Sequence, residues 1–245
     1  MTRVPRRLRH GEADWPWPRL WAEVRFNSPT VVFRRVPPSH APAVRHLKAC
    51  DGVMARVIAK VGPCRLEPER HPEVFQALVE AIIYQQLNGK AAGSIYRKFK
   101  GLYAPKRFPK PAEILATSDG ELRGAGVSPQ KLSYLRDLSA KVEDGTLELR
   151  KLRAWDDEAV IEHLTQVRGV GRWTAEKVLI FTLGRADVLP VDDYGFGRGV
   201  KIAYGLRGHP KPERLRKIGE PWRPFRSVGT WYMWQSLQVG DETGG

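Results

Sequence analysis

The chain has 245 residues, enough for one large domain or two small ones. Its 41 Lys and Arg residues against 27 Asp and Glu give a formal net charge of +14, which favours a polyanionic partner such as nucleic acid. Cys50 and Cys64 are the only cysteines, which excludes a disulfide framework, a four-thiolate zinc site and an iron–sulfur cluster. No apolar run is long enough to span a membrane.

Residues 1–40 form a basic segment rich in Pro and Trp. Residues 21–26 alternate apolar and polar side chains, and residues 30–36 are β-branched and aromatic, so the two stretches are compatible with a short β hairpin. The arginines near the start are not followed by an apolar core, so we expect no secretory signal and an intracellular protein, cytoplasmic or nuclear.

From residue 42 onward, apolar side chains recur at helical spacing, which predicts an all-α body. Three such faces are Met54, Val57, Ile58 and Val61; Phe75, Leu78, Val79, Ile82 and Ile83; and Ala92, Ile95, Tyr96 and Phe99. Ser118 and Glu121 have the spacing of a capping box, and Ser128 before Pro129 predicts another helix start. Three prolines between residues 105 and 111 indicate a linker between two lobes.

The most informative stretch is residues 164–194. Two glycines, Gly169 and Gly171, lie between two helical segments, where they allow positive φ and leave backbone amides open to a phosphate group. Arg168 and Arg172 flank them. A glycine pair alone would more often be a tight turn. The Pro-Val-Asp-Asp sequence at residues 190–193 favours a DNA contact beside a catalytic carboxylate.

This stretch resembles the helix-hairpin-helix, Gly/Pro-rich, Asp motif of base-excision DNA glycosylases, and in particular the 3-methyladenine DNA glycosylase II family. The resemblance covers residues 75–234 and includes three further blocks, at residues 81–92, 122–131 and 222–234. It implies two helical lobes around a DNA-binding cleft. We expect residues 41–104 with 203–245 to form the first lobe and residues 105–202 to form the helix-hairpin-helix lobe.

The resemblance also implies which carboxylate acts. A buried carboxylate stabilises the positive charge that develops on the sugar when an N-glycosidic bond breaks, and it can orient the attacking water. Asp193 matches the family position, whereas the shorter Pro-Val-Asp pattern of more distant relatives would select Asp192. The remaining aspartate is then expected to cap a helix.

Trp173, Tyr194 and Trp234 match family positions near the substrate pocket, although core packing is the alternative for each. Aromatic faces suit alkylated purines that carry positive charge. Trp173 occupies the place where lyase-active relatives carry a lysine, and an indole forms no Schiff base. The departure implies a monofunctional enzyme that uses water.

Leu87 matches the family wedge that fills the gap left by an extruded base, with Gln86 beside it; both could instead cap a buried helix. Further candidates for phosphate contacts are Lys90, Lys177 and Arg226. We expect a monomer without cofactor or metal that excises alkylated purines from double-stranded DNA. The alternatives are oxidised or deaminated bases as substrates, or a non-catalytic DNA-binding module.

Overall fold

A computed structural model describes residues 40–67 and 73–240, so the hairpin expected within residues 21–36 lies outside the described residues. Throughout the described part the regular structure is helical, without a strand, which confirms the all-α prediction. None of the helices in this part is long and apolar enough to cross a membrane.

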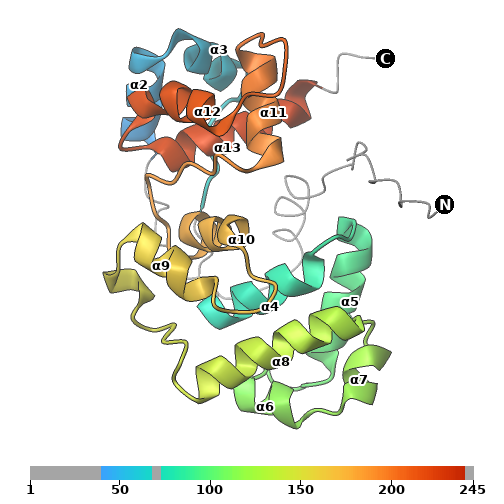
Figure 1. Cartoon of the computed structure of the whole chain (residues 1–245). Helices are drawn as coiled ribbons and strands as arrows, with labels where there is room; N and C mark the ends of the chain where they lie inside the picture. Colours follow the sequence, from blue (N-terminus) through green and yellow to red (C-terminus); the bar gives the residue numbers. More distant parts are fainter. Residues whose placement is uncertain (1–39, 68–72, 241–245) are drawn as a thin grey trace, which may run out of the picture.

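One group of helices contains both ends of the described chain (Figure 1). It consists of α2 (Ala41–Cys50), α3 (Gly52–Val61), α11 (Tyr194–Ala203), α12 (Pro212–Gly219), the short η3 (Glu220–Trp222) and α13 (Arg226–Gly240). Helix α13 is its centre, because it packs against α2, α3, η3 and α11. We call this group the terminal lobe.

The intervening chain forms the second group, which we call the hairpin lobe (Figure 1). Its members are α4 (Val74–Tyr84), α5 (Gly89–Gly101), α6 (Pro111–Ala116), α7 (Asp119–Gly124), α8 (Pro129–Glu143), η1 (Leu152–Ala154), α9 (Asp157–Leu164), α10 (Arg172–Lys177) and the π-helix η2 (Val178–Thr182). In Figure 1, α10 lies between the terminal lobe and the rest of the hairpin lobe.

The boundaries of the lobes differ from those expected. Helices α4 and α5, within the predicted first lobe, belong to the hairpin lobe, because α4 packs on α8 and η2. The reason is the sequence of α4, which buries eight residues of its eleven and so needs neighbours on most of its surface. Helix α11 belongs instead to the terminal lobe, where Gly199 lets its backbone approach the Met233 carbonyl of α13.

Local sequence signals for helix starts are confirmed. The Ser118 hydroxyl accepts a hydrogen bond from the Glu121 amide, and the Glu121 carboxylate accepts from the Ser118 amide. The Ser128 hydroxyl accepts from the Lys131 amide at the start of α8, and that helix ends at Glu143, just before Gly145. These caps set the lengths of the helices that support the hairpin.

Candidate active site

Asp193 lies where the chain passes from the hairpin lobe into α11. Its side chain is the N-cap of that helix: Oδ1 accepts a hydrogen bond from the Phe196 amide at 2.5 Å. Only 2% of Asp193 is exposed, whereas Asp192 is exposed to solvent. The cap that the sequence assigned to the other aspartate is thus made by the buried one, since a side chain at the N-cap turns back over the helix start.

Both carboxylate oxygens of Asp193 have two donor groups nearby. The Trp234 indole N–H donates to Oδ1 at 2.8 Å, and the Trp173 indole N–H donates to Oδ2. The Lys177 ammonium lies 3.6 Å from Oδ2. Burial alone would raise the pKa of Asp193, but Lys177, the two indoles and the Phe196 amide outweigh it and hold the pKa below its ordinary value. The carboxylate is therefore ionised at neutral pH.

Aromatic rings surround the other side of Lys177. Its Nζ lies 3.4 Å from the ring centroid of Trp234, 5.2 Å from that of Trp173 and 5.6 Å from that of Phe181. Trp234 and Phe181 are stacked, with centroids 5.8 Å apart and an interplanar angle of 22°. We call these three rings the aromatic cage. Phe181 is a member that the sequence gave no reason to select over ordinary core residues.

Lys177 is thus not a surface phosphate contact, as expected from its charge, but faces inward with 15% of its side chain exposed. It lies one helical turn after Trp173, so both side chains lie on the same face of α10. Burial lowers the pKa of Lys177, and the Asp193 carboxylate opposes that shift. The spacing of Trp173 and Lys177 was the sequence signal for this arrangement.

A second carboxylate lies behind this site. Glu176 has 4% of its side chain exposed; Oε1 accepts from Arg172 at 3.2 Å, while Oε2 is buried and has no hydrogen-bond partner among the described residues. Burial raises its pKa to about 7, and Asp192 and Asp193 add to the rise against the opposing effect of Arg172. Sequence reasoning missed Glu176, because a glutamate on a helix is most often solvated.

The guanidinium of Arg172 is already paired. It donates to both carboxylate oxygens of Glu158 in addition to Glu176. Arg226, another expected phosphate contact, donates to the Asp187 carboxylate and carbonyl. These two arginines hold elements of the protein together, which corrects their assignment as free phosphate-binding charges. Lys90 and Arg168 are exposed, as a phosphate contact requires.

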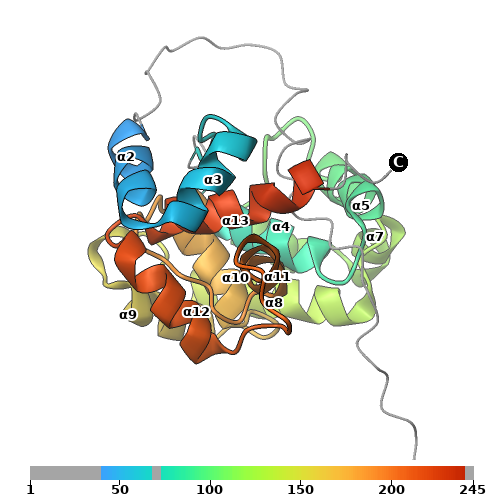
Figure 2. The same ribbon diagram turned by 90° about the horizontal axis from the view of Figure 1, so that it is seen from above.

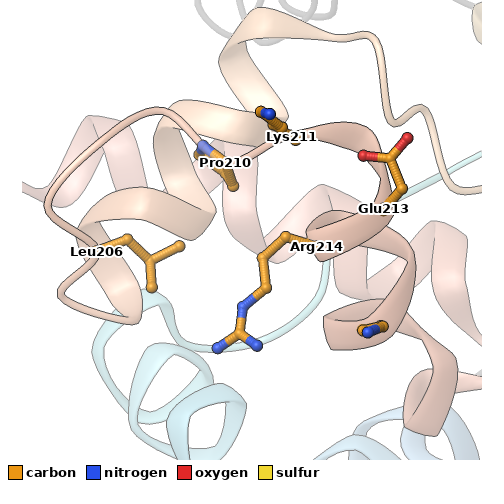
Figure 3. A pocket seen from close by; sticks show the side chains of 6 residues that line it. Leu206, Pro210, Lys211, Glu213 and Arg214 are labelled. Carbon is orange, nitrogen blue, oxygen red and sulfur yellow. The ribbon is translucent and has the colours of Figure 1, made fainter.

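Tyr194, expected in the substrate pocket, turns away from the cage. It is 56% exposed and stacks on His209, with centroids 5.1 Å apart and planes 11° from parallel. A separate surface pocket is lined by Leu206, Pro210, Lys211, Glu213, Arg214 and Lys217, which come from α12 and the loop before it (Figure 3). That pocket shares no lining residue with the cage around Asp193.

The hairpin between α9 and α10 uses its two glycines differently. Gly169 has φ +80°, and a side chain there would collide with the ring of Tyr134. Gly171, the N-cap of α10, has φ −98°, and a side chain there would meet no atom within 4 Å. The positive φ expected at both positions is found at Gly169 alone. Gly171 is exposed, so its missing side chain keeps the approach to the α10 amides open.

The turn after α4 lies against this hairpin. Gln85 donates from Nε2 to the Gly169 carbonyl at 2.7 Å, and Lys131 donates to the Ile83 carbonyl at 2.7 Å. Gln86 is exposed with φ +57°, the only non-glycine residue with positive φ in residues 40–67 and 73–240. Leu87 is half-buried against the core. The predicted wedge therefore lies on a strained turn that is tied to the hairpin.

Comparison with known proteins decides the family. The model of the HhH-GPD superfamily of base excision DNA repair proteins matches residues 79–224, more than half of the chain. The protein belongs to this superfamily. Among its HhH-GPD relatives is the DNA-3-methyladenine glycosylase 1 of Schizosaccharomyces pombe, 33% identical over 202 residues that cover 81% of this chain and 88% of the relative.

Solved structures agree with this membership of the HhH-GPD superfamily. The S. pombe 3-methyladenine DNA glycosylase in complex with abasic DNA superposes with a TM-score of 0.73, at 32% identity, covering 82% of this chain and 98% of that one. A DNA-3-methyladenine glycosidase from Bacillus halodurans gives a TM-score of 0.73 at 36% identity, covering 82% and 92%. The likeness to the Escherichia coli DNA-3-methyladenine glycosylase 2 is lower, at 25% identity over 66% of this chain and 57% of the relative.

Proposed function

We propose that this protein is a DNA glycosylase that flips alkylated purines, of the 3-methyladenine and 7-methylguanine class, out of double-stranded DNA and excises them by hydrolysis. The observation that carries the proposal is the buried, ionised Asp193 beside Trp173 and Trp234. A DNA-binding module has no use for a buried negative charge near phosphates. The relatives named as 3-methyladenine DNA glycosylases support the same activity.

Asp193 has the charge that the reaction needs. As the bond between the base and the sugar breaks, positive charge develops on the sugar, and a fixed carboxylate in a dry site stabilises it more strongly than water can. The same carboxylate can receive a proton from the water that attacks the sugar. Because Asp193 is fixed by α11 and by indoles from α10 and α13, its position requires no rearrangement during the reaction.

The surrounding elements provide the grip on DNA. We assign Arg168 and the amides at Gly169 and Gly171 to the phosphate backbone, and Leu87 with Gln86 to the gap left in the base stack. The hydrogen bond from Gln85 to the Gly169 carbonyl keeps the wedge turn and the hairpin in register. A protein that works in this way needs one copy, so we expect a monomer on DNA.

The test is incubation of the purified protein with duplex oligonucleotides, each carrying one alkylated, oxidised or deaminated base. We expect release of free alkylpurine and abasic sites that become strand breaks only after heat or alkali, because Trp173 provides no amine. Borohydride should therefore trap no covalent complex. Binding without release of any base would establish a binding module instead, and release confined to oxidised or deaminated bases would overturn the alkylpurine assignment.

A further inference from the structure

The position of Lys177 has a consequence for the choice of substrate. Its ammonium covers the face of Trp234 at 3.4 Å and lies within 5.6 Å of the other two rings of the aromatic cage. The same group lies 3.6 Å from Asp193. The chain thus already holds a cation on the surface where a flipped base would stack.

A positively charged base would meet two obstacles in this cage. The attraction between a cation and an aromatic face is satisfied by Lys177 until the ammonium leaves Trp234. Even after it moves, Asp193 keeps Lys177 close by, and like charges at short distance repel each other strongly in a partly buried site. Purines alkylated at N3 or N7 carry such a positive charge in DNA.

A neutral base has the opposite requirement. When the bond from the sugar to N9 breaks, the electron pair goes to the base, so a cationic base leaves neutral while a neutral base leaves as an anion. The Lys177 ammonium can donate a hydrogen bond, and then its proton, to a ring nitrogen of a departing neutral base. Water adds to the sugar, and the proton that it loses restores the ammonium.

We propose that Lys177 is a specificity-determining residue that shifts the lesion range toward neutral damaged purines and away from cationic N3- and N7-alkylpurines. The inference rests on the proposed glycosylase function and names the substrate class of that same site. It predicts that this chain prefers ethenoadenine, a neutral alkylation product, to N7-methylguanine. It also predicts that the preference depends on one side chain.

The experiment compares single-turnover excision of N7-methylguanine and ethenoadenine by the parent, Lys177→Met and Lys177→Arg. Methionine keeps the length without the charge, so the rate ratio of the cationic to the neutral lesion should rise by about tenfold or more. Arginine keeps the charge but gives up no proton, so excision of the neutral lesion should fall while the cationic lesion stays poor. Lys98→Met, at an exposed position on α5, is the matched control and should leave the ratio unchanged.

An equal loss on both lesions in Lys177→Met would overturn the inference, because Lys177 would then only position Asp193. An unchanged ratio would overturn it as well. Equilibrium binding in the Asp193→Asn background gives an independent readout: adding Lys177→Met should tighten binding of the N7-methylguanine duplex relative to the ethenoadenine duplex. Thermal unfolding of each variant separates these effects from misfolding. A parent that releases neither base while binding both duplexes contradicts the proposed function rather than this assignment.

Discussion

At the scale of single residues, Asp193 is the group on which chemistry depends. Asp193→Asn keeps the shape of the side chain but removes the charge, so base excision should fall by roughly two orders of magnitude or more. Excision rates under single-turnover conditions measure this. The exposed neighbour gives the matched control, and Asp192→Asn should retain the parent rate.

The amide at position 193 should also lower stability. Its NH₂ group would face N–H donors in place of an acceptor, and the Lys177 ammonium would lose its partner. A lower melting temperature in Asp193→Asn than in Asp192→Asn is the expected result. If the Asp192 variant were the inactive one, the assignment of the pair would be wrong by one residue.

Glu176 predicts how stability changes with pH. Its folded-state pKa of about 7 lies above the ordinary value of 4.5. Its contribution to stability is therefore complete below pH 4.5 and is lost as the pH rises through 7. This loss amounts to something on the order of 3 kcal/mol. Denaturant unfolding at several pH values should show a fall for the parent that is much weaker in Glu176→Gln. Parallel curves for the two proteins would mean that Glu176 ionises normally.

The sequence was sufficient to choose Asp193 but not to describe its surroundings. Family spacing identified the carboxylate and both indoles, because their order along the chain is part of a motif. Lys177 and Arg172 were misjudged, since charge alone says nothing of direction. Lys177 turns inward toward a carboxylate sixteen positions later, and Arg172 is neutralised by Glu158 of the preceding helix.

At the scale of elements, the hairpin should separate folding from DNA binding. Gly171→Val places a side chain in open space, so the melting temperature should stay near that of the parent while affinity for damaged and undamaged duplex falls alike. Gly169→Ala forces a side chain against Tyr134 at positive φ, so it should lower the melting temperature. Unchanged affinity in Gly171→Val would reduce the hairpin to a turn.

The turn after α4 predicts a different behaviour. Leu87→Ala should reduce excision from duplex DNA more than from single-stranded DNA, because a wedge matters only where a base stack must be kept open. Parallel rate measurements on the two substrates test this. Equal losses would make Leu87 a core residue, which its half-buried position against the core would then explain.

Element starts were predictable because capping is local: Ser118 and Ser128 need only residues three positions away. The assignment of helices to lobes was not, because it depends on which distant surface covers each face. The proline-rich linker suggested a boundary near residue 105. Instead the chain crosses between lobes before α4 and again before α11, where the sequence has no comparable break.

At the scale of the whole molecule, the charge of +14 should make DNA binding depend steeply on salt and weakly on sequence. Removing Arg168 should reduce the slope of log affinity against log salt by about one phosphate contact, or roughly 0.9. Arg172→Gln is the comparison, since its guanidinium is already paired with Glu158 and Glu176. Fluorescence anisotropy between low and physiological salt measures both slopes. An identical slope for Arg168→Gln and the parent would remove Arg168 from the DNA contact.

The chain order of the lobes bears on when the protein becomes able to act. In the view of Figure 2, α13 runs across the molecule beside α3, although most of the sequence separates them. The hairpin lobe is continuous, so it can fold on the ribosome while the terminal lobe still lacks its later helices. Trp234, however, comes from the last helix of all. A nascent chain can therefore present a finished DNA grip long before it has a site that breaks a glycosidic bond, and catalysis begins only once synthesis has passed α13.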